Sequence, residues 1–81
     1  MTRYHFHTED GRCFPDREGT ELANFQAARA YAVRCTGELL VEEPMLFLKH
    51  DCLTMRVTDD DGLALFSIDV SGICAPVSPG R

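Results

Sequence analysis

Apolar and polar residues alternate in residues 3–8, a pattern typical of a β-strand with one buried face. Tyr4 and Phe6 fall on one face of this strand, and we expect that face to join the core. His5 and His7 fall on the opposite face. The pattern therefore predicts a strand that presents two imidazoles on the same side.

A turn and a second strand follow directly. We expect residues 9–11 to form a three-residue hairpin loop that ends in a glycine with left-handed backbone. This register places Phe14 opposite Phe6, and it places Cys13 opposite His7. A loop of two residues would turn Phe14 toward the histidine face, so the longer loop is favoured.

Helical periodicity begins after a polar connection at residues 16–23. Asn24 is a favourable N-cap, and Pro44 is expected to end the helix. Between them, apolar residues recur at steps of three and four, as expected for a helix that lies on a sheet: Phe25, Ala28, Ala32, Cys35 and Leu39. Other helix residues are expected to face solvent: Tyr31, Arg34 and Glu38. Residues 45–48 are expected to add one helical turn.

A second hairpin is predicted by the alternation that returns in residues 53–70. Asp61 and Gly62 are typical of a two-residue type I′ turn. That turn sets three apolar pairs opposite each other on one face: Val57 with Phe66, Met55 with Ile68, and Leu53 with Val70.

These elements predict an α+β fold of the order ββαββ, in which an antiparallel four-stranded sheet carries one long helix on one face. We expect a single domain at residues 1–71 and a flexible tail at residues 72–81, which are rich in Pro, Gly and Ser. The open edges of the sheet could pair with another chain. Its second face is expected to be uncovered and to carry the following residues: His5, His7, Arg56, Leu63 and Leu65.

The composition narrows the classes of function. Apolar residues make up 44% of the chain and charged residues 26%, which is typical of a globular protein. The net charge of -5 disfavours direct nucleic-acid binding. The sequence shows neither a secretion signal nor an apolar run long enough for a bilayer, so we expect a cytoplasmic protein without a membrane partner. The four cysteines form no Cys-x-x-Cys pair, and we expect them to be thiols.

A zinc site is one hypothesis for the histidine face. His5 and His7 stand two apart on a strand and project from the same side, which suits two imidazole ligands. Zinc needs at least one more ligand, and the candidates His50, Cys13 and Cys52 do not stand at a spacing that indicates one. The competing interpretation is an ordinary solvated strand face.

Two further patterns are better explained without a site. Residues 59–62 form an acidic hairpin tip and not a calcium loop, because an EF-hand would need acids in place of Val57 and Ile68. Cys13 with His7 is the one nucleophile and base that the predicted fold brings together, and no third group orients them. We therefore predict that the chain is not an enzyme and requires no cofactor.

The sequence also resembles a known family. The motifs RYHFH, DGR, EGTEL, FQAARAYAVRCTGELL, the Glu43-Pro44 pair and VTDDDGLALFSI are together similar to a family of short bacterial domains of unknown function. The resemblance covers the chain from Arg3 to about Val70, and it implies the same α+β arrangement and a cytosolic bacterial origin. It implies no activity, ligand or functional residue. His7 matches the family pattern, whereas members tend to carry an aromatic residue at the position of His5 and a Trp near Leu48 and Leu53.

Together these observations favour a non-enzymatic interaction or regulatory module that forms a homodimer through its sheet. The alternative is a zinc-binding protein that uses His5 and His7. A third hypothesis is a regulator of antitoxin type that acts on nucleic acid with a partner, although the acidic composition speaks against direct contact.

Overall fold

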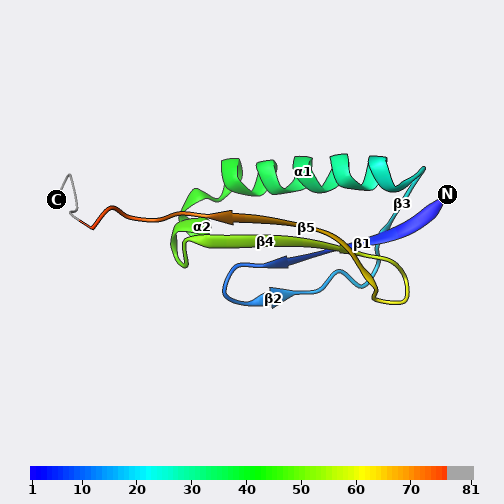
Figure 1. The fold of residues 1–81 in the computed structure, drawn as a ribbon, viewed down its shortest axis with the longest axis horizontal. Coiled ribbons are helices and arrows are strands. Elements are labelled where there is room, and N and C mark those ends of the chain that lie inside the picture. Colours follow the sequence, from blue (N-terminus) through cyan, green and yellow to red (C-terminus); the bar gives the residue numbers. More distant parts are fainter. Residues whose placement is uncertain (77–81) are drawn as a thin grey trace.

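The computed structural model describes residues 1–76, so part of the predicted tail at residues 72–81 lies outside the described residues. The fold is α+β, with one antiparallel sheet and one main helix (Figure 1). In chain order the elements are β1 (Thr2–Glu9), β2 (Cys13–Phe14), β3 (Thr20–Leu22), α1 (Phe25–Glu42), α2 (Pro44–Leu48), β4 (Cys52–Thr58) and β5 (Ala64–Ser71).

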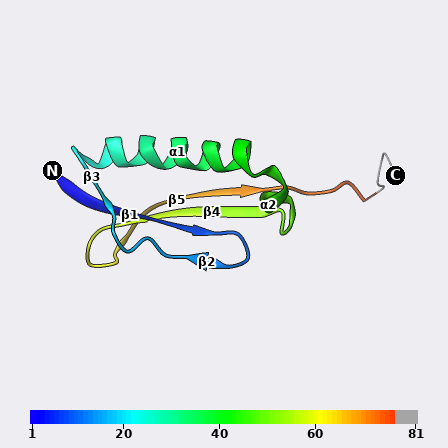
Figure 2. The same cartoon turned by 180° about the vertical axis from the view of Figure 1, so that it is seen from behind.

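The strands lie in the order β2-β1-β4-β5, and β3 pairs with β1 outside this path. Helix α1 runs along one face of the sheet, and α2 sits at the end where β4 begins, as the two opposite views show (Figures 1 and 2). The predicted class and the single covering helix are thus confirmed. The sheet has five strands and not the four that were predicted.

The additional strand is β3, which lies within the segment that was predicted to be a polar connection. Thr2 pairs with Leu22, and Tyr4 pairs with Thr20. A strand of three residues is too short for its alternation to stand out in the sequence. Its place is set by the N-terminal half of β1, which extends beyond the pairing with β4.

The register of the first hairpin differs from the prediction. Thr8 lies opposite Phe14 and Glu9 opposite Cys13, so neither Phe6 with Phe14 nor His7 with Cys13 forms a pair. Because the shift is two residues, Phe14 keeps the predicted face. The loop is residues 10–12, and it is fixed by contacts that turn statistics cannot supply: the buried Asp10 accepts the Arg12 N–H, and His50 packs on Gly11.

Helix α1 begins and ends as predicted, with Asn24 as its N-cap, Glu43 as its C-cap and Pro44 as the next residue. The Asn24 Oδ1 accepts the Ala27 N–H at 2.9 Å. Ala28 and Ala32 are fully buried against the sheet. Their small side chains allow the helix to approach the sheet closely. Tyr31 was predicted to face solvent, but its ring packs on Phe6 with 4.8 Å between centroids.

The second hairpin has the predicted pairs, Val57 with Phe66, Met55 with Ile68 and Leu53 with Val70. Its turn is different: Asp59 accepts the Gly62 N–H and donates to the Leu63 carbonyl, which makes a loop of three residues. Gly62 adopts a φ of 85°, the left-handed conformation that such a loop needs. The observed loop is one residue longer than the predicted turn, and a register shift between Val57 and Thr58 compensates for this. The apolar residues therefore stay on the core face.

The core is one thin layer between α1 and the three longest strands. Its buried members are Tyr4, Phe6, Ala28, Ala32, Met55 and Val57. Val57 is the largest side chain that is completely buried, since the helix contributes only alanines at the centre. A core this small makes the domain one of modest stability.

Candidate functional site

The two edges of the sheet differ greatly in length. Strand β2 has two residues and is followed by Pro15, which cannot donate a hydrogen bond to a neighbouring strand. Strand β5 has eight residues, and within residues 1–76 no strand pairs with its outer side. A long unpaired strand is a template for another chain, so the β5 edge is the first candidate for an interaction site.

The direction of the β5 backbone groups follows from one hydrogen bond at the end of the strand. The Gly72 N–H donates to the Asp51 carbonyl at 2.9 Å and therefore points toward β4. Backbone groups alternate in direction along a strand. Those of Phe66, Ile68 and Val70 thus face β4, and the N–H and C=O groups of Ser67 and Asp69 face outward.

The side chains of β5 divide its two faces sharply. Phe66, Ile68 and Val70 lie on the helix side and are half-buried. Arg29 of α1 lies over the Phe66 ring, but within residues 1–76 no further strand pairs with β5. Ser67 and Asp69 lie on the other face and are exposed, with the Thr54 hydroxyl donating to Asp69 Oδ1 at 2.8 Å. The β5 edge thus offers an apolar row on one face and short polar groups on the other.

The histidine face of β1 is built differently from the prediction, because the segment after β2 crosses it. His5 Nδ1 lies 2.9 Å from the Asp16 carbonyl oxygen, and His5 Nε2 lies 2.8 Å from Asp60 Oδ1. Both neighbours are acceptors, so the imidazolium form of His5 donates to both of them. Its side chain is 13% exposed, and this part of the face is covered and not open to solvent.

His7 has the opposite hydrogen-bond requirement. The Asp16 N–H donates to His7 Nδ1 at 3.0 Å, so this nitrogen must be unprotonated. The other nitrogen, Nε2, then carries the hydrogen and donates to the Thr58 hydroxyl oxygen at 3.0 Å. The two rings lie nearly parallel, with 6.2 Å between their centroids. The hydrogen-bond partners therefore favour different protonation states for these adjacent imidazoles.

Asp16 is the centre of this arrangement. Its Oδ1 accepts the N–H groups of Glu18 and Gly19, and its Oδ2 accepts the Phe6 N–H. Burial opposes ionisation of this carboxyl group, but the three backbone donors outweigh it and hold the pKa of Asp16 below its usual value. The carboxylate thus ties the segment that links β2 and β3 to β1.

The pKa values of the two histidines move apart for the same structural reasons. The hydrogen bond to Asp60, followed by that to the Asp16 carbonyl, raises the pKa of His5. Burial, followed by the charge of Arg56, lowers the pKa of His7. Arg56 itself donates to Glu9 Oε2 at 2.9 Å. The charged groups of this face are therefore engaged in pairs within the domain.

Zinc binding by His5 and His7 would have to displace the hydrogen bond of at least one nitrogen in each ring, since all four nitrogens have partners. Within residues 1–76, no group of three or more His, Cys, Asp or Glu side chains is arranged to hold a metal ion. The zinc hypothesis stays a prediction, and elemental analysis of metal in untagged protein would test it. Cys13, one of the candidates for a third ligand, lies opposite Glu9 and not opposite His7, as the predicted register had placed it.

The comparisons with known proteins place the chain in a family. The chain belongs to the family described as Domain of unknown function (DUF6894), whose model matches residues 3–71. No curated protein and no solved structure shows significant similarity to it. In the described part of the chain, no helix is long and apolar enough to cross a membrane.

Sequence reasoning found the histidines but missed Asp16, which explains them. The signal was available in the segment Asp-Arg-Glu-Gly at residues 16–19, because an aspartate three residues before a glycine is typical of a loop closed by its own side chain. Gly19 adopts a φ of 76°, and a side chain there would meet Arg3, His5 and the Tyr4 carbonyl. His5 and His7, predicted as possible ligands, therefore help to hold the loop of residues 16–19 against β1.

Proposed function

We propose that this protein is a non-enzymatic interaction module that forms a homodimer by antiparallel pairing of its β5 edges. The observation that carries the proposal is the asymmetry of the sheet: β5 is a long edge with outward backbone donors and acceptors, whereas the other strands beside β1 are the two-residue β2, followed by Pro15, and the three-residue β3. Pairing of two such edges would satisfy the outward groups of both copies and cover the half-buried row on the helix side.

The residues of β5 favour one register for this pairing. If the two-fold axis passes at Ile68, each Asp69 lies opposite the partner copy's Ser67, where a hydroxyl can donate to the carboxylate. On the helix face the same register sets Ile68 opposite its own copy and Phe66 opposite Val70. The central pairs at residues 66–70 are then complementary, with apolar residues on one face and polar residues on the other, while Leu65 lies opposite Ser71 nearer the strand ends.

The neighbouring symmetric registers are less favourable. An axis at Asp69 brings two carboxylates directly opposite each other, which destabilises a strand pair. An axis at Ser67 sets Asp69 opposite Leu65 and leaves the carboxylate without a partner. The Ile68 register is therefore the one that we assign to the dimer.

The dimer is tested by the mass in solution, measured by light scattering over a range of protein concentrations. The parent chain is expected to give twice the monomer mass. Ser67→Asp places like charges opposite each other in the Ile68 register, and we expect it to weaken association at least tenfold. Ser67→Lys places an ammonium group opposite Asp69 of the other copy at two symmetric positions, and we expect it to strengthen association.

Ser67→Thr is the matched control, because it keeps the hydroxyl group and should leave the mass unchanged. A parent chain that stays monomeric at every concentration contradicts the dimer. A dimer that both charged substitutions weaken contradicts only the register, since an axis at Ser67 would bring two introduced charges of the same sign together. Circular dichroism of each variant checks that the fold is retained.

A further inference from the structure

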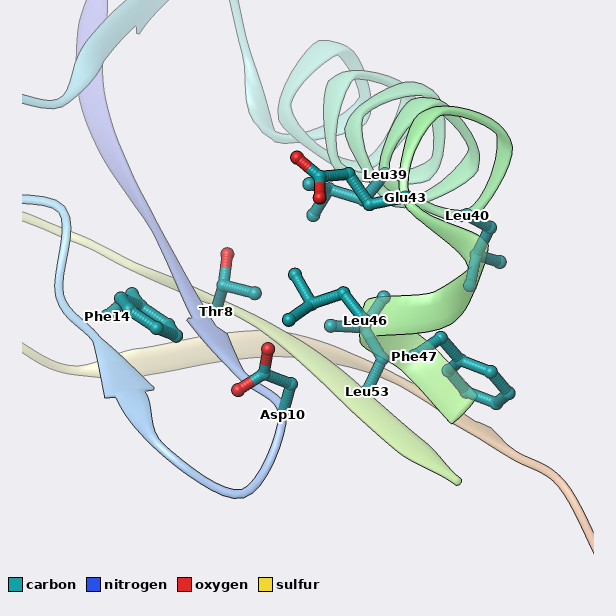
Figure 3. A pocket seen from close by; sticks show the side chains of 9 residues that line it. All are labelled: Thr8, Asp10, Phe14, Leu39, Leu40, Glu43, Leu46, Phe47 and Leu53. Carbon is teal, nitrogen blue, oxygen red and sulfur yellow. The ribbon is translucent and has the colours of Figure 1, made fainter. Parts of the chain in front are cut away.

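A cavity of about 290 Å³ opens at the end of the molecule where the β1–β2 hairpin meets the helices (Figure 3). Leu39 and Leu40 of α1, Leu46 of α2 and Leu53 of β4 form apolar walls. Phe14 closes the side formed by β2, although 45% of its surface is exposed. No residue of β5 lines this cavity, so it is separate from the proposed dimer edge.

A buried carboxyl group lies in this apolar wall. Asp10 is only 3% exposed, and its Oδ1 accepts the Arg12 N–H at 3.3 Å. Within residues 1–76, its second oxygen, Oδ2, accepts no hydrogen bond. In Figure 3 this carboxyl group is directed into the space between Phe14 and Leu46. Since no side-chain oxygen within residues 1–76 is both enclosed and without a hydrogen-bond partner, Oδ2 remains accessible, and a ligand with a cationic donor could bind it.

The rest of the lining has the same charge preference. Glu43 stands at the rim, where its exposed carboxylate lies on the helix side of the cavity. Thr8 adds one hydroxyl group. No Lys, Arg or His from the described chain lines the cavity, although the Arg12 guanidinium lies over the Phe14 ring at 5.0 Å from its centroid. Two acids in apolar walls define a site that repels anions and attracts organic cations.

We propose that this cavity binds a small organic ammonium ion with a compact apolar body. The apolar body would occupy the space between Leu39, Leu46 and Leu53, and the ammonium group would donate to Asp10 Oδ2. The volume equals that of roughly ten water molecules at about 30 Å³ each, which limits the ligand to a fragment the size of an aryl-alkyl amine. Such a site follows the usual plan of apolar walls and a few directed polar groups.

Three probes of one shape test the charge preference: 2-phenylethylamine as the cation, 2-phenylethanol as the neutral analogue and phenylacetate as the anion. Each is titrated into the ¹⁵N-labelled chain at pH 7, and amide shifts are followed at Thr8, Asp10 and Leu53, with Ser67 as a distant control. We expect the amine to bind at least tenfold more tightly than the alcohol and phenylacetate to bind most weakly.

Asp10→Asn is the decisive variant, because the amide oxygen can still accept the Arg12 N–H while the charge is lost. We expect it to remove most of the preference for the amine, and we expect Glu43→Gln, at the exposed rim, to reduce it about threefold. Equal binding of amine and alcohol, an unchanged preference in a folded Asp10→Asn chain, or shifts that avoid the cavity would overturn the proposal. If Asp10→Asn does not fold, titration of the three probes into the parent chain and into Glu43→Gln still tests whether the cavity prefers the cation.

Discussion

At the scale of single residues, the pair on β1 shows how neighbouring groups of one chemical type acquire opposite charge preferences. His5 faces two acceptors, which favour its doubly protonated form. His7 accepts the Asp16 N–H at Nδ1, which excludes a proton on that nitrogen. The hydrogen bonds to Asp60 and to the Asp16 carbonyl raise the pKa of His5, and burial lowers the pKa of His7. Both effects act around the ordinary histidine value of about 6.5.

The stability of the domain should therefore depend on pH through two opposing contributions. The contribution of His5 is complete below about pH 6.5 and is lost as the pH rises through its raised pKa. The contribution of His7 is complete above about pH 6.5 and is lost as the pH falls toward its lowered pKa. Because the two pH ranges meet near pH 6.5, these two residues should stabilise the parent chain most at about that pH.

Substitution of each histidine in turn should separate the two slopes. In His7→Gln the free energy of unfolding is expected to fall as the pH rises from about 6 to 8, because only the His5 contribution remains. In His5→Gln it is expected to rise between about pH 5 and 7. Urea denaturation at each pH measures these profiles. Slopes of the same sign in the two variants would contradict the assigned protonation states.

A second residue-scale prediction concerns Gly11 in the first hairpin. Its φ is 102°, and a Cβ at this position would lie 2.6 Å from the His50 ring. Gly11→Ala should therefore lower the free energy of unfolding by at least about 1 to 2 kcal/mol, since a left-handed backbone and a clash act together. In the double variant Gly11→Ala/His50→Ala, the part of the lost free energy that is due to the clash should be recovered. Urea denaturation of both chains measures the difference.

At the scale of elements, what the sequence predicts well are the parts whose pattern is long and local. Helix α1 has both its cap and its terminating proline in the sequence, and the second hairpin has three apolar pairs that only one register can satisfy. The two-residue β2 and the three-residue β3 are different, because contacts with distant segments decide them. Phe6 does not pair with Phe14, because it lies opposite Val57 of β4 on one side of β1 and donates its N–H to the Asp16 carboxylate on the other.

The candidate sites follow the same rule. The open edge was expected from the fold class, because antiparallel sheets of this kind leave edge strands unpaired. That the eight-residue β5 forms the open edge could not be read from the sequence, since strand order depends on tertiary pairing. The environment of Asp10 was equally hidden, because its burial requires the hairpin tip to pack under α2 and His50.

Helix α1 offers an element-scale prediction in which two substitutions act in opposite directions. Asn24→Ala removes the acceptor for the Ala27 N–H and should cost about 1 kcal/mol of stability. A Cβ at Gly37 would meet nothing within 4 Å, so Gly37→Ala should gain up to about 1 kcal/mol from helix propensity alone. Thermal denaturation followed by circular dichroism measures both. A loss of stability in Gly37→Ala would show that the helix is bent or packed at this position.

At the scale of the whole molecule, association and stability should be linked. The core is thin, and the dimer would cover Phe66, Ile68 and Val70, which are half-buried in one copy. A partner that binds the native state raises its apparent stability with concentration. The melting temperature of the parent chain should therefore increase with protein concentration, and that of Ser67→Asp should not. Differential scanning calorimetry at two widely separated concentrations measures this, and a constant melting temperature in the parent chain would contradict the link.

The short strand β2 has a consequence for how far such an assembly can grow. A sheet with two long edges can add copies without end, as in a fibril. Here the β5 edge of each five-stranded copy can be used once, and the other strands beside β1 are the two-residue β2, which is followed by Pro15, and the three-residue β3. Pairing about a two-fold axis consumes both usable edges and closes the assembly at two chains. In the proposed dimer, Pro15 next to β2 would hinder the addition of a further chain and so oppose polymerisation.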